Sequence, residues 1–325
     1  MSNECYTSRM TNRIHTKIQD WYMLHGRKDL PWRTDTEAYA IYLSEVMLQQ
    51  TQVKTVLERY YFPFLKRFPT LEALGKASID DVLKMWEGLG YYNRAKNLHK
   101  TAQMISALPE DLDALQKLPG IGINTAHAIA SFAYGQAVPI MEANVKRILC
   151  RLDQLTAPKD KELWALAYAL LDETNAFDYN QAMMDIGAMV CTPKDPDCPA
   201  CPLSSICKGQ DNPIAYPIKK KKKVPTRETY IMIRVYEDRL ALVRREGKFL
   251  HGLWGFEATD VPLCASEYIG EVTQLYTHFK SLAKIYLYHA LEADEESYFS
   301  EEEIRQLAIS KIDDKILSLY LSVTC

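Results

Sequence analysis

The sequence predicts a mainly α-helical N-terminal region followed by a smaller α+β C-terminal domain. Three observations lead to this prediction. Apolar residues recur at helical spacing before residue 209, a polar segment rich in proline and lysine follows, and alternating apolar residues typical of strands come after it. We therefore expect a helical region over residues 1–208, a linker over residues 209–227 and an α+β domain over residues 228–325.

Length and composition limit the class of protein. The chain has 325 residues, of which 47% are hydrophobic, and a net charge of −3. The charge argues against general coating of polyanions, but DNA binding needs only local basic clusters. No stretch approaches the ~18 apolar residues of a membrane span, and residues 1–15 lack the apolar core of a signal peptide. We expect a cytoplasmic chain that does not enter a membrane.

Apolar stripes with helical spacing mark the N-terminal region. One stripe runs from Tyr42 to Tyr61 and has a polar break at Gln49–Gln52, and a second runs through residues 163–171. Prolines separate the helical segments, at Pro31, Pro63, Pro69, Pro109, Pro119, Pro139 and Pro158. A polar Gln-Gln break between apolar stripes fits an exposed loop tip.

Leu118–Gly122 reads LPGIG and precedes an alanine-rich run. Gly120 and Gly122 permit a tight hairpin between two helices and leave backbone N–H groups uncovered at the start of the second helix. A phosphate can bind there. The pattern predicts a helix-hairpin-helix that holds a DNA backbone, although an ordinary helix–helix turn fits the same residues.

The C-terminal domain shows the alternation of strands. Tyr230–Tyr236, Leu240–Arg244 and Ile285–Leu291 are rich in Ile, Val, Leu and Tyr. Ser300 and Glu303 then form a capping box, which predicts a final helix starting there. The linker before this domain contains Lys219–Lys223, which suits either a solvated tether or a strap across DNA phosphates.

Four cysteines lie close together, at Cys191, Cys198, Cys201 and Cys207. Four thiolates in so short a stretch can bind one metal centre. Disulfides need an oxidising compartment, and structural zinc sites more often use two Cys-x-x-Cys pairs, of which this run has one. The residues alone leave zinc and an iron–sulfur cluster as alternatives.

Several further motifs accompany the cysteines: LPW at Leu30–Trp32, SEVMLQQTQV at Ser44–Val53, GLGYYNRAKNLHK at Gly88–Lys100, LPGIG at Leu118–Gly122, NVKR at Asn144–Arg147 and NQAMMDIGAMVC at Asn180–Cys191. Together they resemble the MutY-type adenine DNA glycosylases of the helix-hairpin-helix superfamily. The resemblance is dense over about residues 10–210 and thinner beyond them.

The resemblance implies a fold, a reaction and partners. It implies a six-helix barrel, an iron–sulfur cluster domain whose loop 191–207 binds a 4Fe–4S cluster through the four cysteines, and a Nudix-like C-terminal domain. The implied reaction is hydrolysis of the N-glycosidic bond of adenine mispaired with 8-oxoguanine or guanine, in base excision repair. The implied partner is double-stranded DNA containing that mispair, bound by a monomer, with nucleoid association if the source is bacterial.

The reaction needs two carboxyl groups, one to protonate the departing purine and one to stabilise the sugar cation. Glu45 matches the family's general acid. At the second position the family has Asp-Gly-Asn-Val, whereas residues 142–145 read Glu-Ala-Asn-Val. Three alternatives remain for Glu142: it serves with an adjusted backbone, it serves a modified reaction or substrate, or the protein binds lesions without cleaving. Asn144 of this stretch is assigned to the catalytic site with it.

Asn124 bears on the reaction type. Bifunctional relatives carry a lysine at this position, which attacks the sugar and cuts the strand. Asparagine cannot form a Schiff base, so the resemblance implies a monofunctional glycosylase. Asn124 is then expected to hold a water or the sugar phosphate, or to be a plain helix-start residue.

The resemblance also implies residues that recognise the DNA. Trp32, Arg33 and Asp185 are expected to line or support the pocket for the flipped adenine, although a core aromatic and a plain ion pair are the alternatives. Gln50 and Tyr91 are expected to wedge into the duplex beside the lesion.

Tyr276, Thr277 and His278 lie where the family has the loop that reads 8-oxoguanine, although a strand-end tyrosine and a histidine with partners inside the protein are the alternative. No acidic Nudix box is present, so pyrophosphate hydrolysis is not expected. Three rival functions remain. They are an electron carrier, a lesion-binding protein without activity, and a glycosylase for another mismatch such as thymine or uracil.

Overall fold

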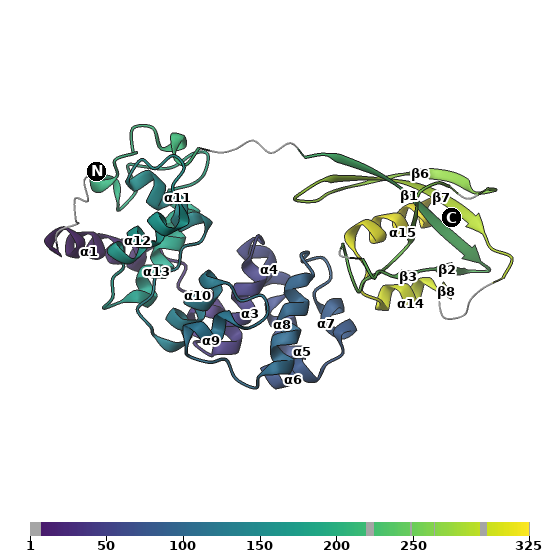
Figure 1. The fold of residues 1–325 in the computed structure, drawn as a ribbon, viewed down its shortest axis with the longest axis horizontal. Helices are drawn as coiled ribbons and strands as arrows, with labels where there is room; N and C mark the ends of the chain where they lie inside the picture. Colours follow the sequence, from purple (N-terminus) through teal and green to yellow (C-terminus); the bar gives the residue numbers. More distant parts are fainter. Residues whose placement is uncertain (1–7, 219–223, 248, 263, 293–297, 325) are drawn as a thin grey trace. The chain divides into compact units, whose positions relative to one another are not determined.

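The structure is a computed structural model that describes residues 8–218, 224–247, 249–262, 264–292 and 298–324 (Figure 1). The lysine run at residues 219–223 lies outside the described residues. The chain divides into two compact units, one formed by Met1–Gln50 and Met104–Lys220 and the other by Thr51–Gln103 and Lys221–Cys325. The domain limits expected from the sequence stay a prediction.

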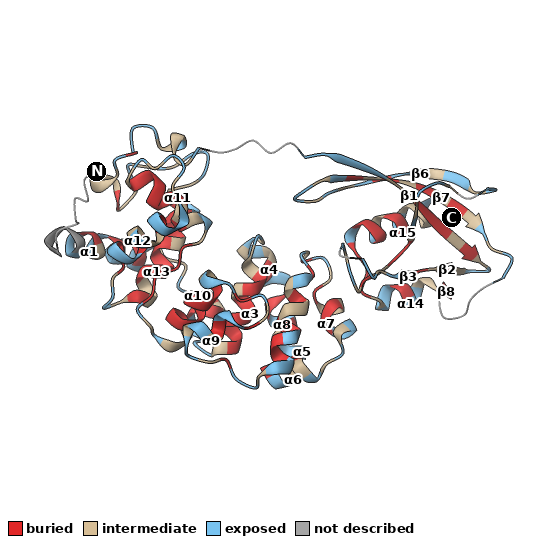
Figure 2. Ribbon diagram, viewed as in Figure 1, coloured by how far each residue is buried: buried red, intermediate tan, exposed pale blue. Residues whose placement is uncertain are grey.

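The first unit is helical. Its elements are α1 (Ser8–His25), α2 (Pro31–Thr34), α3 (Ala38–Leu48), α9 (Leu112–Gln116), α10 (Ile123–Tyr134), α11 (Ala143–Leu152), α12 (Asp160–Leu170), α13 (Ala176–Asp185), the π-helical turn η1 (Ile186–Val190) and the 3₁₀ turns η2 (Ser204–Ile206) and η3 (Pro213–Ala215). Helix α10 packs on α3, and α1 packs on α13. Figure 2 shows buried residues along α3, α10, α11 and α13.

Local sequence explains where these helices begin and end. Helix α3 ends at Leu48, and Gln50 takes a left-handed φ of 57° before the next helix starts at Val53. This interruption confirms the predicted polar break. The side chain of Asp111 caps α9, and Gly135 ends α10 in the left-handed conformation that glycine adopts without strain.

The second unit begins with five helices: α4 (Val53–Arg59), α5 (Tyr61–Arg67), α6 (Leu71–Lys76), α7 (Ile79–Met85) and α8 (Asn93–Met104). Thr70 and Ser78 accept hydrogen bonds from backbone N–H groups and so cap α6 and α7. Pro63 lies inside α5, so it does not separate two segments as the sequence suggested. It occupies the first turn, where proline removes no intrahelical hydrogen bond.

The rest of the second unit is a sheet with two helices. The elements are β1 (Thr226–Tyr236), β2 (Arg239–Ala241), β3 (Val243–Arg244), β4 (Trp254–Gly255), β5 (Glu257–Thr259), β6 (Glu267–Leu275), β7 (Lys280–His289), β8 (Tyr298–Phe299), α14 (Glu301–Gln306) and α15 (Lys311–Thr324). The main sheet has the order β6-β7-β1-β2-β8, with β5 also paired to β1, and β3 pairs with β4 apart from it. Strands β1 and β7 are parallel, and α15 packs against β6.

These elements confirm a helical region followed by an α+β region. Strand β1 contains the predicted strand Tyr230–Tyr236, and β7 contains most of the predicted strand Ile285–Leu291 but ends at His289. The predicted strand Leu240–Arg244 is divided between β2 and β3, which belong to different sheets. The capping box at Ser300 and Glu303 is present at the start of α14. This helix is not the final one as predicted, because α14 ends at Gln306 and α15 follows it. Among the helices that the structure describes, none is both long enough and apolar enough to cross a membrane.

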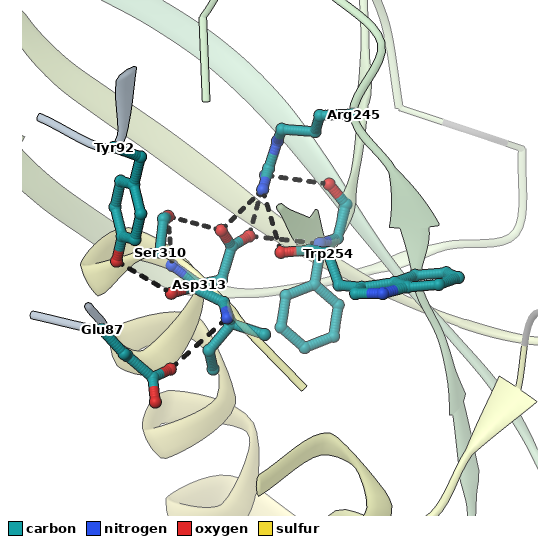
Figure 3. A network of polar contacts seen from close by, with 8 residues as sticks. Glu87, Tyr92, Arg245, Trp254, Ser310 and Asp313 are labelled. Atoms are coloured by element: carbon teal, nitrogen blue, oxygen red, sulfur yellow. Dashed lines mark hydrogen bonds and ion pairs between the residues drawn. The ribbon is translucent and has the colours of Figure 1, made fainter. Parts of the chain in front are cut away.

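Asp313 in α15 is the centre of a buried polar network (Figure 3). Its carboxylate accepts hydrogen bonds from Arg245 at 2.7 and 2.8 Å, from the Phe256 backbone N–H at 3.1 Å and from the Ser310 hydroxyl at 2.5 Å. These contacts tie α15 to the segment around β4. The carboxylate is fully buried, so the guanidinium and the other donors must replace its hydration.

The same network reaches the helical part of the second unit. The Tyr92 hydroxyl donates to the Ile309 carbonyl at 3.2 Å, and the Ile309 N–H donates to Glu87 at 3.4 Å (Figure 3). Lys84 donates to the Leu307 carbonyl at 3.1 Å. Side chains of residues 84–92 therefore bind the backbone between α14 and α15.

Candidate catalytic and DNA-binding site

Two acidic residues that are distant in the sequence come together in the first unit. Glu45 lies on α3 beside the buried residues Val46 and Met47, and its side chain is partly buried. Glu142 is the N-cap residue of α11, with an extended backbone. The charge of Glu142 acts on Glu45. The helices thus place two carboxyl groups in one electrostatic environment.

The environment of this pair favours protonation. Burial raises the pKa of Glu45 to about 8, the charge of Glu142 acts in the same direction, and Arg33 opposes them. Burial also raises the pKa of Glu142. Two neighbouring carboxylates away from water cannot both ionise readily, so the pair retains one proton near neutral pH.

Arg33 belongs to a buried ion network around Asp185. The Asp185 carboxylate accepts from Arg33 at 2.7 and 2.9 Å, and from the Arg27 side chain at 2.5 and 2.8 Å. The Arg27 backbone N–H also donates to it, at 2.9 Å. Burial acts to raise the pKa of Asp185, but the two arginines outweigh it and hold that pKa below the usual range. Two guanidinium groups face one carboxylate in this network, and one of them, that of Arg33, lowers the pKa of Glu45.

Trp32 and Arg33 come from the short helix α2. Trp32 is buried, so its place agrees with both a core aromatic and a pocket wall. The Nε atom of Arg33 is buried and donates to no group among the described residues. An unused buried donor is costly unless a ligand accepts from it.

The hairpin between α9 and α10 has the predicted form. Gly120 takes φ 74°, which favours glycine, and Gly122 is the N-cap residue of α10. Leu118 and Ile121 are buried and anchor the turn. A Cβ on Gly122 would meet no heavy atom within 4 Å. Internal packing therefore does not require this glycine, and the bare backbone leaves room for an external group.

Asn124 and Asn144 both make contacts within the protein. Asn124, in the first turn of α10, accepts a hydrogen bond from the Met141 backbone N–H at 3.2 Å. Asn144 accepts from Arg147 at 2.9 Å, and a Cβ on Gly187 would lie 2.5 Å from the Asn144 Cβ. Asn124 therefore supports the segment before Glu142, and Asn144 packs against η1.

Gln50 and Tyr91 share an unusual backbone conformation. Gln50 is exposed with φ 57°, and Tyr91 has φ 51° with 45% of its surface exposed. A side chain in this region carries a steric cost, and such residues concentrate at functional sites. Before Gln50, the Gln49 amide donates to Thr125 at 3.3 Å.

In the second unit, Thr277 and His278 are exposed at the tip of the hairpin that joins β6 and β7. The Tyr276 N–H donates to the Phe279 carbonyl at 2.9 Å and closes the tip. The hydroxyls of Thr277 and Tyr91 lie 2.6 Å apart, within hydrogen-bond distance. Two residues expected to contact the lesion strand thus contact each other.

The four cysteines line one pocket, together with Arg151 and residues of the loop 196–213. The described cysteines are free of disulfides. Burial raises the pKa values of the Cys198, Cys201 and Cys207 thiols, and the neighbouring cysteines raise them further. Thiolates gathered in this way repel one another, so their ionised form needs a cation.

In the part of the chain that the structure describes, no group of three or more His, Cys, Asp or Glu side chains is arranged to hold a metal ion. A single zinc ion needs four sulfurs about 2.3 Å from one point. A four-iron cluster is also bound by four cysteine thiolates, so the shared pocket suits the residue types of either site. The guanidinium of Arg151 donates to the Cys191 sulfur at 3.1 Å, and such donors tune iron–sulfur clusters.

Sequence reasoning missed two arginines of these sites. Arg27 binds Asp185, and Arg151 binds the Cys191 sulfur and the Thr192 carbonyl. Arginine is common on helix surfaces, so its residue type carries little signal. The partners are 158 and 40 residues away in the chain, respectively. Only the tertiary fold reveals them.

Residues 43–171 match the family described as HhH-GPD superfamily base excision DNA repair protein. An adenine DNA glycosylase of Buchnera aphidicola (subsp. Schizaphis graminum) is 39% identical over 266 residues, which cover 78% of this chain and 76% of that protein. The human adenine DNA glycosylase is 42% identical over 212 residues, 59% of this chain and 38% of that one.

A solved structure shares the fold of the helical region. It is that of a thermostable thymine-DNA glycosylase, with a TM-score of 0.59 and 26% identity. The match covers 63% of this chain and 99% of that chain.

Proposed function

We propose that this chain, which belongs to the adenine DNA glycosylase family of base excision repair enzymes, removes adenine paired with 8-oxoguanine or guanine. Membership of the family makes it a DNA N-glycosylase. The main support for an intact active site is the pairing of Glu45 with Glu142, because the pKa of Glu45 responds to the charge of Glu142.

Glu45 is the proposed acid. A carboxyl group with a raised pKa is protonated near neutral pH and can donate to a ring nitrogen of the flipped adenine. The C–N bond then breaks, and its electron pair leaves with the protonated adenine. Water adds to the sugar carbon, and its proton returns to Glu45.

Glu142 is the proposed anion that stabilises the sugar cation. A negative charge next to the developing positive charge lowers the barrier most when water is excluded. The proton held by the pair resides on Glu45, which leaves Glu142 ionised at the N-terminus of α11, where the helix dipole favours a negative charge. Asn124 has no amine to attack the sugar, so the strand is left uncut and the enzyme is monofunctional.

A single-turnover assay tests these roles. The substrate is a duplex with one 8-oxoguanine:adenine pair, and the variants are Glu45→Gln, Glu142→Gln and Glu142→Asp, with Glu162→Gln on the exposed face of α12 as control. We expect a loss of at least about 100-fold in both active-site Gln variants, because a positioned acid contributes roughly 10²–10⁴. The control should match wild type. A wild-type rate for Glu142→Gln would show that its role is wrong.

The same assay separates the rival functions. A protein that binds the mispair tightly and releases no adenine is a lesion-binding protein. Release of thymine or uracil without adenine identifies another mismatch glycosylase. A large gain in Glu142→Asp would show that the longer side chain reduces the natural rate.

We propose that Thr277, His278 and Tyr91 select 8-oxoguanine, supported by their exposure and by the contact between Tyr91 and Thr277. In this proposal the C-terminal α+β region is a Nudix-like recognition domain. Thr277→Val keeps the shape and removes the hydroxyl. It should reduce the ratio of excision rates on 8-oxoguanine:adenine and guanine:adenine duplexes, whereas Thr273→Val, exposed on β6, should not. An unchanged ratio would remove Thr277 from recognition.

We propose that Cys191, Cys198, Cys201 and Cys207 hold a 4Fe–4S cluster, supported by their common pocket and the Arg151 donor. This proposal is tested by measuring the iron and zinc content of the protein after purification without oxygen. Wild type and Cys264→Ser should contain about four irons per chain, and Cys198→Ser should contain fewer. Zinc in place of iron in wild type would overturn the assignment.

We also propose that the protein binds duplex DNA as a monomer. Light scattering of the protein, alone and with a mispair duplex, tests this. A mass of one chain per duplex is expected, and two chains per duplex would contradict it.

A further inference from the structure

Residues 138–141 lead directly into Glu142 and are called the approach segment here. They belong to no helix or strand, so no ladder of backbone hydrogen bonds fixes them. Buried backbone groups nevertheless need partners. In this segment side chains supply them.

Three side chains bind the approach segment. Asn180 donates to the Val138 carbonyl at 2.9 Å and accepts from the Ile140 N–H at 3.0 Å. His127 bonds to the Pro139 carbonyl at 2.7 Å. Asn124 accepts a hydrogen bond from the Met141 backbone N–H at 3.2 Å. Each residue of the segment therefore has a backbone group held by a side chain from α10 or α13.

These side chains are themselves fixed. Asn180 and His127 are only 2% and 3% exposed. The second N–H of the Asn180 amide donates to the Ser131 hydroxyl at 3.0 Å. The imidazole of His127 lies edge-on to Trp164, with ring centroids 5.0 Å apart. A carbonyl only accepts, so the Nδ1 atom of His127 carries the proton and donates.

Glu142 is held from the other side as well. Its carbonyl accepts the Lys146 N–H at 2.8 Å, which begins α11. The backbone of Glu142 therefore lies between a fixed helix and a fixed approach segment. Glutamate is one methylene longer than the aspartate of the family, so its side chain must accommodate the difference.

We propose that Asn124, His127 and Asn180 are positioning residues that keep the Glu142 carboxylate beside Glu45. The proposal rests on the role given to Glu142 above. A carboxylate displaced by about 1 Å can lose a factor on the order of 100 in rate. A small shift of the approach segment should therefore reduce chemistry without removing the DNA-binding surfaces.

A pair of variants at His127 tests the proposal. Asn and Leu have nearly the same shape, and both remove the ring that contacts Trp164. Only Asn retains a donor near the place of Nδ1. We expect His127→Leu to lower the single-turnover rate at least about tenfold, in line with the cost of small displacements, and His127→Asn to stay within about threefold of wild type.

Binding is measured on the same full-length proteins, with a duplex that carries 8-oxoguanine opposite a tetrahydrofuran abasic analogue. Both His127 variants should bind it as wild type does. Asn180→Leu should likewise lose rate and retain binding, and Asn175→Ala at the start of the same helix should change neither.

The results that would overturn the inference differ from those that would overturn the function. Equal loss of rate in His127→Leu and His127→Asn, or loss of DNA binding in step with rate, would show that these residues only maintain the fold. A wild-type rate for His127→Leu beside an inactive Glu142→Gln would reject the positioning role alone. An active Glu142→Gln would reject the proposed chemistry itself.

Discussion

Burial and, after it, the charge of Glu142 raise the pKa of Glu45, although the two residues lie within α3 and at the N-terminus of α11. Arg33 acts in the opposite direction on Glu45 and is itself bound to Asp185. One carboxyl group is thereby kept protonated next to a partner that can remain ionised. Burial raises the pKa of Glu142 as well, so the proton that the pair retains is the acid of the proposed reaction.

The excision rate should depend on the protonation of Glu45. Burial raises its pKa to about 8, so the acid form predominates below that pH and disappears above it. The single-turnover rate of wild type should therefore fall as pH rises through about 8. Single-turnover rates between pH 6 and pH 9.5, on duplex that stays paired throughout, measure this.

The Glu142→Gln variant is the control for this pH dependence. It removes a negative charge that raises the pKa of Glu45, so the fall in its residual rate should move to lower pH. A wild-type rate that stays constant up to pH 9.5 would show that Glu45 is not the titrating acid.

Glu45 should also reduce stability at high pH. Its folded pKa lies above its unfolded value, so its contribution is full below about pH 4.5 and is lost as pH rises through about 8. Glu45→Gln cannot ionise and should be more stable than wild type at pH 9, by at least about 1 kcal/mol given ~1.4 kcal/mol per pKa unit. The advantage should vanish near pH 4.5. Urea unfolding at both pH values checks this, and equal differences at the two would contradict it.

Local features of the sequence predicted local structure well. Gln49–Gln52 interrupted an apolar stripe, and the chain leaves the helix there because Gln50 takes a left-handed φ. Ser300 and Glu303 formed their capping box. Such features depend on residues within one turn, so residue type and spacing are sufficient to predict them.

Residue type and local spacing did not predict the long-range contacts of the site. Asn124 was expected to be a helix-start residue or to hold water or phosphate. It does lie in the first turn of α10, but the sequence did not predict that its side chain binds the Met141 backbone. Asp185 looked like the partner of Arg33 alone, and Arg27 binds it as well. These partners are selected by how α1, α2, α10 and α13 pack, which no local pattern encodes.

Asp185 should be essential for stability. Asp185→Asn leaves the guanidinium groups of Arg27 and Arg33 with no carboxylate between them, and removing one member of a buried ion network costs about 3–5 kcal/mol. Asp160→Asn breaks the exposed pair with Lys146 and should cost less than about 1 kcal/mol. Thermal and urea unfolding of both variants measure the difference. Similar losses in the two would show that the buried network contributes no more than a surface pair.

Asp313 should be as important for the stability of the second unit as Asp185 is for the first. Its carboxylate is fully buried and accepts from Arg245, Ser310 and the Phe256 N–H (Figure 3). Asp313→Asn places an amide with two N–H groups against these donors and leaves Arg245 without its counter-charge. We expect the unfolding free energy of the sheet to fall by about 3–5 kcal/mol.

The matched control is Glu301→Gln, which breaks an exposed pair with Arg305 one turn away. It should change the unfolding free energy little. Hydrogen exchange of β1 and β7 amides resolves the effect within the full chain, because these strands form the core of the sheet that α15 covers. Unchanged exchange in Asp313→Asn would mean that packing of α15 holds the sheet without the buried ion pair.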